Sequence, residues 1–376
     1  MKKTEIYKIF GKDYKAMTKA LLAETDLKSH IKKGARIGIK PNLVAPTPAE
    51  FGATTHPEVV AGIIEYLQEQ GFSDMTIIEG SWIGDSTEDS FEYCGYSDLS
   101  RQYNVPLVDA QKEGYHSVDC AGMDINIVDA VSQIDFMINV PVLKGHGQTR
   151  MTCALKNMKG LIPNSEKRLF HRQGIHRPVA HLSAGIHQDF IVVDHICGDL
   201  ELEDGGNPIV TDCIMAGFDP VLMDAYCCRL LGFEYTDVEY IKIAAELGLG
   251  STDLSSATVI NCGHSSHPAD TDDDLEPFRN CQDRLFDIRI NVEDDDSCSA
   301  CYGALMPALL SLKEEGRLEE FMKLIGGKIS IGQGNRGRSG CFGIGNCCSN
   351  FDHNIAGCPP KEEDILKEFE RIWNQH

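Results

Sequence analysis

The sequence has few tryptophans, a deficit of positive charge and no long apolar segment. Among 376 residues there are two tryptophans, and 35 Lys and Arg stand against 57 Asp and Glu, a formal net charge of −22. Acidic chains are repelled by nucleic-acid phosphates and anionic lipid headgroups, so we expect neither nucleic acid nor a membrane as partner. No run approaches the roughly 18 apolar residues of a membrane helix. The N-terminal MKKTEIYKIF lacks a signal-like apolar stretch, so cytoplasmic localisation is expected.

Cysteine, by contrast, is abundant, with fifteen residues. Disulfides do not persist in a reducing compartment, so this number favours metal binding or redox chemistry. The nine scattered cysteines before residue 290 are expected to be small buried hydrophobes. Six crowd the last eighty residues: Cys298, Cys301, Cys341, Cys347, Cys348 and Cys358.

Strand-like and helix-like segments alternate through the first 290 residues. The strands are predicted at 35–41, 75–79, 106–109, 125–128, 135–140, 190–195 and 257–261, and the helices at 57–70, 87–103, 220–232 and 236–248. This alternation predicts an α/β fold with a mostly parallel sheet flanked by helices. An Asp-, Pro- and Ser-rich stretch at 264–283 is expected to be a connector. The predicted domains are an α/β substrate-binding domain over 1–292 and a small C-terminal α/β iron–sulfur domain over 293–376, with helices at 302–315 and 361–373 and a strand at 328–331.

The C-terminal cysteines have the pattern of a metal site. Cys298 and Cys301 form a C-x-x-C pair, which lets two thiolates face one metal centre. Cys358 precedes Pro359, as the closing cysteine of bacterial ferredoxin motifs precedes proline. The second half is not a zinc knuckle, because Cys347 and Cys358 are eleven residues apart. This spread favours one 4Fe–4S cluster, with zinc or metal-free thiols as alternatives.

A glycine-rich segment, Gly332-Gln-Gly-Asn-Arg-Gly337, matches the dinucleotide fingerprint G-x-G-x-x-G. That motif needs a helix to begin at the glycines. The following RSGCFG is a poor helix sequence, so we interpret the match as accidental.

A basic segment stands out against the acidic chain. From Lys144 to His187 there are eight Lys and Arg against one acid, and five of the thirteen histidines. The segment begins after a predicted strand, where α/β proteins place ligand groups. One interpretation is a pocket for a small anionic molecule, with proton transfer by a histidine; the alternative is a solvated basic face. The candidate catalytic residues are Lys144, His146 and His171, and the candidate cofactor-binding residues are Lys156 and Asn157.

Four aspartates are further polar candidates. Asp219 precedes Pro220 and is expected to cap a helix. Asp194 ends a predicted strand and is in a position to reach a site, and Asp199 and Asp224 are the other two candidates.

Seven short motifs occur together in one order. They are IKPNLV, THPEVV, the EG at 79–80, INVPVLKGHG, TCALKNMKGLIP, FDPVLMDA and the terminal GNC with GCPP. Together they resemble the family called domain of unknown function 362. Many members carry a ferredoxin-like 4Fe–4S module, so the resemblance implies an iron–sulfur protein without an established reaction. By position it marks Cys347 and Cys358 as ligands beside Cys298 and Cys301, with Cys341 and Cys348 as alternates. The chain lacks the repeated cysteine runs of a two-cluster ferredoxin.

Three functional hypotheses follow. The first is an oxidoreductase that couples one 4Fe–4S cluster to a small anionic substrate or cofactor. The second is a lyase or isomerase in which the cluster is structural or a Lewis acid. The third is an electron-transfer or assembly protein without catalysis of its own, whose acidic surface would dock a redox partner protein.

Overall fold

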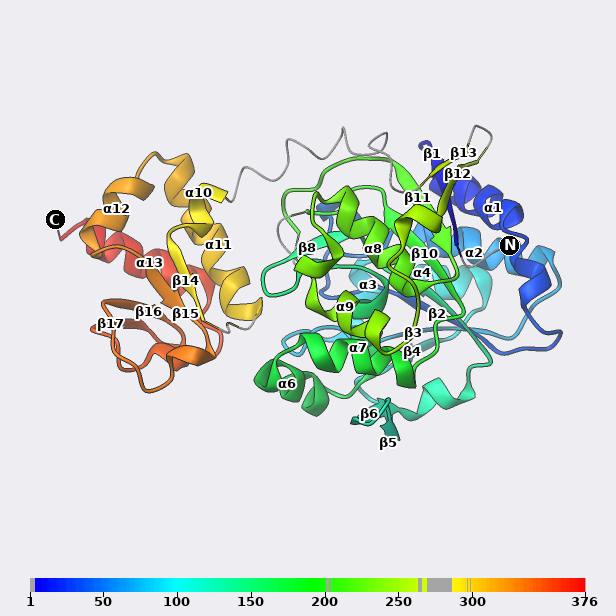
Figure 1. The fold of residues 1–376 in the computed structure, drawn as a ribbon, viewed down its shortest axis with the longest axis horizontal. Coiled ribbons are helices and arrows are strands. Elements are labelled where there is room, and N and C mark those ends of the chain that lie inside the picture. Colours follow the sequence, from blue (N-terminus) through cyan, green and yellow to red (C-terminus); the bar gives the residue numbers. More distant parts are fainter. Residues whose placement is uncertain are drawn as a thin grey trace. The chain divides into compact units, whose positions relative to one another are not determined.

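The computed structural model describes residues 4–200, 203, 205–262, 266–268, 286–295, 297 and 299–375 (Figure 1). Cys298 and most of the predicted connector at 264–283 lie outside these residues. The chain divides into two compact units, residues 1–145 with 151–279 and residues 280–376 with 146–150. The predicted boundary between 292 and 293 falls inside the second unit, at the start of its sheet. Among the described residues, no helix is long and apolar enough to cross a membrane.

The first unit is built on one mixed sheet with the strand order β13-β12-β1-β11-β10-β7-β2-β3-β4 (Figure 1). From β10 to β4 the neighbouring strands run parallel, whereas β11 is antiparallel to both β1 and β10. The predicted mostly parallel α/β fold is therefore confirmed. The strands are β1 (Glu5–Phe10), β2 (Ile37–Pro41), β3 (Met75–Glu79), β4 (Leu107–Asp109), β7 (Phe136–Val140), β10 (Phe190–His195), β11 (Cys213–Gly217), β12 (Thr258–Asn261) and β13 (Ser266–Pro268).

Helices cover both faces of this sheet, because successive strand side chains point to opposite faces. In β7, Ile138 packs in one buried apolar cluster and Met137 in the other. The cluster containing Ile138 is covered by α1 (Tyr14–Glu24), α2 (Pro57–Glu69), α3 (Thr87–Tyr93) and α4 (Tyr96–Tyr103). The cluster containing Met137 is covered by α5 (Ala154–Asn157), α6 (Asn164–Gln173), α7 (His176–Gly185), α8 (Pro220–Leu230) and α9 (Glu239–Glu246).

One predicted helix is two in the structure. The segment predicted as a single helix over 87–103 is broken between α3 and α4 at Gly95. Gly95 has a φ of 79°, a conformation that is costly for residues with a side chain and that ends a helix.

The remaining elements of the first unit are short. Away from the main sheet, β5 (Tyr115–Asp119) and β6 (Asp124–Val128) form an antiparallel ribbon. Two further strands, β8 (Lys144–His146) and β9 (Arg150–Thr152), pair with each other on either side of the turn at 147–149, and residues 146–150 of this hairpin belong to the second unit. The 3₁₀ turns of the two units are η1 (Leu27–His30), η2 (Ala49–Phe51), η3 (Asp129–Gln133), η4 (Met158–Leu161), η5 (Tyr235–Asp237), η6 (Leu254–Ser256), η9 (Gln333–Asn335) and η10 (Asn346–Cys348).

The second unit is a smaller α/β layer. Its sheet has the order β14-β15-β16-β17, and all three pairings are parallel. Phe321, Phe342 and Phe369 pack together in its core. Its strands are β14 (Val292–Asp294), β15 (Ile329–Ile331), β16 (Phe342–Ile344) and β17 (His353–Ile355), and its helices are α10 (Phe286–Arg289), α11 (Ser299–Glu314), α12 (Leu318–Leu324) and α13 (Glu362–Trp373).

Candidate functional site

The main sheet has a topological switch point between β2 and β7. The chain moves outward from β2 to β3 and β4, then returns to the other side of β2 as β7 and continues to β10. Connections therefore leave the carboxyl ends of β2 and β7 in opposite directions, which opens the place where such sheets bind ligands. Four polar residues lie at the carboxyl ends of adjacent strands: Glu79 of β3, Lys40 of β2, Asn139 of β7 and Asp194 of β10. We call the region around these strand ends the carboxyl edge.

A buried ion pair occupies the switch point. Lys40 Nζ lies 2.6 Å from Glu79 Oε2, and both side chains are almost fully buried. Two backbone N–H groups, of Leu43 and Gly80, also donate to the Glu79 carboxylate, at 3.0 and 2.7 Å. Burial lowers the pKa of Lys40, and the Glu79 charge opposes this shift. The pair thus places a positive and a negative group side by side at the end of two parallel strands.

Two asparagine amides continue this network across β7. Asn157 Oδ1 accepts from Lys40 Nζ at 3.2 Å, while its Nδ2 donates to Asn139 Oδ1 at 2.7 Å. Asn139 in turn donates to the Gln188 side chain and to the Ala154 carbonyl. The predicted cofactor-binding residue Asn157 is therefore buried at the carboxyl edge, where its amide joins β2 to β7.

A second buried lysine reaches the same edge from α6. Lys167 Nζ donates to the carbonyls of Gly80 and Ser81, at 2.9 and 2.8 Å. Burial lowers its pKa to about 8. An amine with such a pKa is protonated at neutral pH and loses its proton in mildly alkaline solution.

The predicted residues Lys144 and Lys156 meet at Glu203. Lys144 Nζ donates to the carbonyls of Glu203 and Ala53, at 2.7 and 2.6 Å. Lys156 Nζ lies 3.8 Å from Glu203 Oε2 and donates to Thr152 Oγ1 at 3.1 Å. Both lysines are buried. The charge of these lysines is thus part of the interior of the first unit and not of a solvated face.

Of the two predicted histidines, His146 and His171, the structure describes the side chain of His146. His146 is buried, and its Nδ1 accepts from the backbone N–H groups of Gln148 and Thr149, both at 3.1 Å. This arrangement requires the tautomer with the proton on Nε2. His171 lies in α6, and its side chain is outside the described residues.

Asp194 ends β10 and binds a histidine. Its Oδ2 accepts from His56 Nδ1 at 2.8 Å and from the His56 backbone N–H at 2.7 Å, while its Oδ1 accepts from Ile196 N at 3.1 Å. Burial disfavours the charge of His56, but Asp194 and Cys197 outweigh it and raise the pKa of His56 to about 11. His56 is therefore an imidazolium at neutral pH.

The other aspartates have structural partners. Asp219 caps α8, as predicted, with Oδ1 accepting from Val221 N and Leu222 N. Asp224 accepts from the backbone of Ala154 and Leu155 at the start of α5, and burial raises its pKa to about 7. The Asp199 carboxylate accepts from the backbone N–H of Asn207.

In the second unit, the candidate cysteine ligands follow the carboxyl ends of parallel strands. Cys347 comes after β16 and Cys358 after β17, and Cys298 follows β14 in the sequence. The loops after β16 and β17 are joined, because Asn346 N donates to Gly357 O at 2.8 Å and Gly357 N to Asn346 Oδ1 at 2.9 Å. We call this reciprocal pair the Asn346–Gly357 clamp.

Cys301, at the start of α11, approaches the same loop. A Cβ atom on Gly345 would lie 3.2 Å from Cys301 Sγ and 3.6 Å from Gly357 O. Gly345 has a φ of 89°, so both its conformation and its surroundings suit glycine. Segments bearing Cys301, Cys347 and Cys358 therefore meet around Gly345.

The two alternate cysteines have other surroundings. The backbone of Cys348 belongs to the loop around Gly345, because its N–H donates to Gly345 O at 3.1 Å. Its side chain is fully buried, and its Sγ donates to Ser330 O of β15 at 3.3 Å. Cys341 is exposed at the opposite end of β16, in a cavity of about 280 Å³ shared with His353, and is not part of this loop.

Cysteine ligands and a glycine-rich loop suit an iron–sulfur cluster, whose sulfides accept backbone hydrogen bonds. Within the described residues, no three His, Cys, Asp or Glu side chains are close enough together to hold a metal ion. The donor chemistry and the meeting of the cysteine segments thus fit the group, while the metal site itself remains a prediction.

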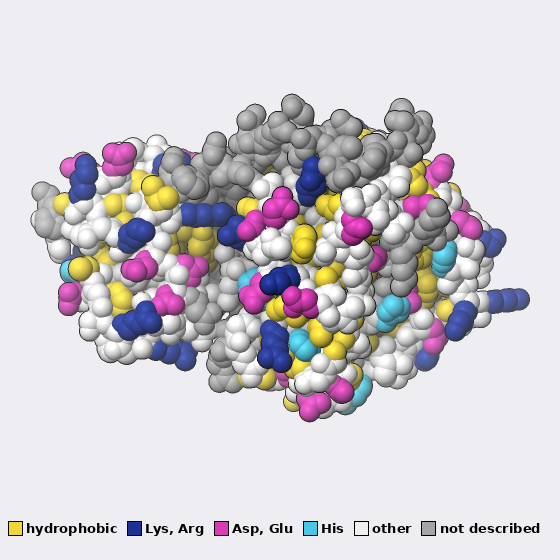
Figure 2. Space-filling model, in the orientation of Figure 1, with side chains coloured by type: hydrophobic (Ala, Val, Ile, Leu, Met, Phe, Trp, Pro, Cys, Tyr) yellow, Lys and Arg dark blue, Asp and Glu magenta, His cyan; other side chains and the backbone are white. Residues whose placement is uncertain are grey.

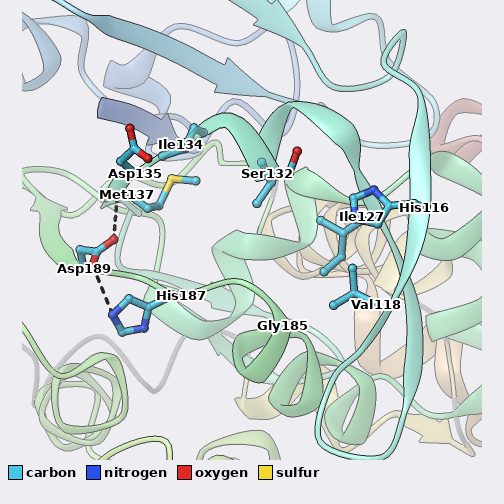
Figure 3. Close-up of a pocket in the computed structure, with 11 residues that line it drawn as sticks. His116, Val118, Ile127, Ser132, Ile134, Asp135, Met137, Gly185, His187 and Asp189 are labelled. Carbon is cyan, nitrogen blue, oxygen red and sulfur yellow. Dashed lines mark hydrogen bonds and ion pairs between the residues drawn. The ribbon is translucent and has the colours of Figure 1, made fainter. Parts of the chain in front are cut away.

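Two cavities of the first unit are at the opposite edge of its sheet. One cavity of about 300 Å³ is near the amino ends of β7 and β10, where His187 Nε2 contacts Asp189 at 3.3 Å (Figure 3). Asp189 also accepts from the backbone of Met137. On the face drawn in Figure 2, Lys and Arg side chains alternate with acidic ones. A single-sign ligand patch is therefore not seen on that face.

Sequence analysis missed several members of the carboxyl edge, namely Lys40, Glu79, Asn139, His56, Lys167 and Cys197. The signal for the first four was present, because IKPNLV, EG, INVPVLKGHG and THPEVV contain them. We used these motifs only as marks of a resemblance. Each supplies a polar side chain to one edge of the sheet.

The fold and its carboxyl edge define an open-sheet α/β protein with a polar switch point. Residues 37–229 match the family model described as "Domain of unknown function (DUF362)", and the chain belongs to this family. It is 25% identical over 235 residues to the thylakoid-associated protein sll1697 of Synechocystis sp., a match that covers 59% of this chain and 71% of the relative. The lactate racemase apoprotein of Thermoanaerobacterium thermosaccharolyticum matches with a TM-score of 0.42 and 12% identity, over 60% of this chain and 56% of that chain.

Proposed function

We propose that the protein is an iron–sulfur oxidoreductase that carries one 4Fe–4S cluster in its second unit and binds a small anionic molecule at the carboxyl edge of its first. The observation that carries the proposal is the meeting of the segments bearing Cys301, Cys347 and Cys358 around Gly345. Cys298 would complete the ligand set, since its C-x-x-C spacing ties it to Cys301. A bound cluster supplies one-electron chemistry.

The anionic substrate is supported by the cations of the carboxyl edge. Lys40 and Lys167 are buried there, and Lys144 and Lys156 are buried together at Glu203. Burying an ammonium group is costly, and an anion nearby lowers that cost. Lysine is a common ligand of phosphate and carboxylate groups. These residues would bind and orient the anion, while Lys167 is the amine best suited to hold or release a proton near neutral pH.

The cluster is tested by metal analysis on the full chain purified without air. We expect brown protein with about four iron atoms and about four sulfides per chain after reconstitution. Cys301→Ser, Cys347→Ser and Cys358→Ser are expected to lose most of the iron. Cys341→Ser is the matched control, because Cys341 lies at the other end of β16 and should leave loading unchanged. Stoichiometric zinc, or equal iron in all four variants, contradicts the proposal.

The anion site is tested separately on the loaded protein. We expect phosphate or a small carboxylate to raise the melting temperature of the wild type, and Lys156→Met to reduce this shift. Lys242→Ala, on the exposed face of α9, is the control. If the same anion also alters the electron paramagnetic resonance spectrum of the reduced cluster, this supports oxidoreductase chemistry. Iron loading with no anion effect favours the electron-transfer or assembly hypothesis instead.

A lyase or isomerase is the second candidate, and Lys167 favours it. Its lowered pKa is the property that a proton-transferring amine needs. Turnover of a substrate without any change in the redox state of the cluster would distinguish this reaction class from the first.

A further inference from the structure

Three reactive side chains lie together where β10 ends and α2 begins. Cys197 Sγ is 3.6 Å from His56 Nε2, and His56 Nδ1 is 2.8 Å from Asp194 Oδ2. The order is thiol, imidazole, carboxylate, with each imidazole nitrogen facing one partner. Such an order activates a cysteine, because a charged imidazole beside the sulfur stabilises the thiolate while the carboxylate orients the ring and stabilises its charge.

The neighbouring backbone fixes this arrangement. Both oxygens of Asp194 accept backbone N–H groups, from His56 and Ile196, so the carboxylate cannot rotate away from the ring. His56 is the residue that precedes α2, a helix of thirteen residues, and the positive end of that helix favours an anion nearby. The local structure therefore places a positive group beside the Cys197 sulfur, where it would stabilise the thiolate that forms during attack.

The groups that face His56 come from three elements. Asp194 at the end of β10 is the nearest, Cys197 follows it, and the Tyr14 ring of α1 packs edge-on with its centroid 5.4 Å away. The Tyr14 hydroxyl donates to Asp212 at 2.8 Å, and burial together with Asp212 raises the pKa of Tyr14, so it stays neutral. The Asp194 carboxylate is thus the negative group that holds the imidazolium, whose pKa is raised to about 11.

The chain contains a matched thiol without an imidazole. Cys94 is about as buried as Cys197, at 4% against 6% exposed. Its Sγ donates to Thr47 O at 3.2 Å, as Cys197 Sγ donates to Ala49 O at 3.4 Å. Burial raises the pKa of Cys94 to about 11. The two thiols share a loop and a type of carbonyl contact, and differ in the presence of His56.

We propose that Cys197 is a nucleophilic thiol, activated by His56 and Asp194, and that small uncharged electrophiles such as hydrogen peroxide modify it. The remaining exposure of Cys197 is small, so only a small molecule can approach the sulfur. A charged electrophile would have to lose its water on entry, which is costly. The site does not involve the cysteines of the second unit. It shares Asp194 with the carboxyl edge, but its test does not require the proposed anion or the cluster to be bound.

The reaction with peroxide balances within this group. The thiolate attacks one peroxide oxygen, the S–O bond forms and the O–O bond breaks. Sulfur is oxidised to the sulfenic acid, and the peroxide is reduced. The hydroxide that leaves takes a proton from the His56 imidazolium and becomes water, so that His56 ends neutral.

The proposal is tested by the labelling rate of each cysteine in the full chain. A brief exposure to iodoacetamide is followed by denaturation, a second label and peptide mass spectrometry. At pH 7 we expect Cys197 to react about tenfold faster than Cys94, because the charged His56 imidazole faces the Cys197 sulfur, whereas burial raises the pKa of Cys94. Between about pH 6 and 8 the Cys94 rate should rise about tenfold per pH unit, because burial keeps this thiol protonated.

Two further measurements separate activation from mere access. His56→Gln should bring the Cys197 rate down to that of Cys94, because the charged group beside the sulfur is gone. If this variant unfolds, the labelling rate of Cys94 rises as well. The comparison of Cys197 with Cys94 in the wild type then decides alone. After a pulse of hydrogen peroxide, dimedone should mark Cys197 and not Cys94. Equal rates for the two thiols in the wild type, or dimedone labelling of both alike, overturn the proposal.

Discussion

At the scale of single residues, burial of charge is the feature that sets this protein apart. Lys40 and Glu79 form an ion pair in the interior, where each charge depends on its partner. Removing one partner of such a pair typically costs about 3–5 kcal/mol, because the other charge is left without compensation. Lys167 instead donates to two backbone carbonyls, and its pKa is lowered because desolvation by burial outweighs the attraction of Glu79.

The Lys167 charge predicts a pH-dependent stability. An unfolded lysine has a pKa of about 10.4, so between pH 8 and 10 the unfolded chain binds a proton that the folded chain has released. The free energy of unfolding contributed by Lys167 therefore rises with pH through this window, by up to about 1.4 kcal/mol per unit, and is constant below it. Urea titrations of the wild type and Lys167→Met at pH 7 and 9 should show the wild type gaining relative to the variant. An unchanged difference would mean that Lys167 titrates normally.

The residues of the carboxyl edge show where sequence reasoning stopped. Asp219 was correctly predicted as a helix cap from Pro220 alone, because capping is a local property. Lys40 and Glu79 are separated by 39 residues, and only the parallel pairing of β2 with β3 brings them together. A single lysine in a short strand carries no periodic signal that predicts a buried ion pair.

At the scale of elements, the strands with strong apolar patterns were predicted and the others were not. Residues 37–41, 75–79 and 136–140 fall within predicted strands, whereas β1 and β11 were missed. β1 contains the buried Lys8, and β11 is the short sequence CIMAG with small residues. Both depend on pairing with distant strands, a tertiary effect that outweighs local propensity.

Asp219 gives the first prediction at this scale. Its carboxylate accepts from Val221 N and Leu222 N at the start of α8 and from Ser251 N at 2.9 Å. Asp219→Ala should lower the free energy of unfolding by about 2 kcal/mol, since it leaves several buried donors without an acceptor. Asp13→Ala is the control: Asp13 caps α1 through one exposed contact and should cost less than about 1 kcal/mol. Chemical denaturation measures both, and equal losses would contradict the assigned role.

The loop around Gly345 gives the second prediction at the scale of elements. Gly345→Ala would force a side chain into a φ of 89° and a ψ of 166°, and bring it against Cys301 Sγ. Such a conformation costs about 1–3 kcal/mol outside glycine. Gly337→Ala also has a positive φ, of 78°, but its new Cβ meets no atom within 4 Å. We expect both variants to lose stability and only Gly345→Ala to lose iron on reconstitution. Equal iron content in the two variants would show that this loop is not part of the cysteine site.

At the scale of the whole molecule, the two units have separate sheets and separate cores. The two tryptophans are divided between them, Trp82 in the first unit and Trp373 in the second, where Arg317 stacks on the Trp373 ring. Each unit therefore carries its own fluorescent reporter. The alternation of segments predicted the α/β class of both units. It did not predict the strand order, which depends on pairing between strands that are far apart in the sequence.

This division predicts two unfolding transitions. With Trp373→Phe the remaining Trp82 follows the first unit, and with Trp82→Phe the remaining Trp373 follows the second. Loading with iron and sulfide should raise the midpoint of the Trp373 transition and leave the Trp82 transition in place, because a ligand stabilises the unit that binds it. A common midpoint that shifts for both reporters would show that the units unfold as one.

The Asn346–Gly357 clamp has a consequence for how cofactor delivery would proceed. The two hydrogen bonds join the β16 and β17 loops through protein atoms alone, so the second unit keeps this corner ordered before any inorganic ion arrives. Zinc fingers, by contrast, collapse when their metal is withdrawn. After chelation of the loaded protein, the amide protons of Asn346 and Gly357 should therefore still exchange slowly with deuterium. A cluster donor would then meet a loop that is already ordered, so that cluster removal and reloading could be repeated.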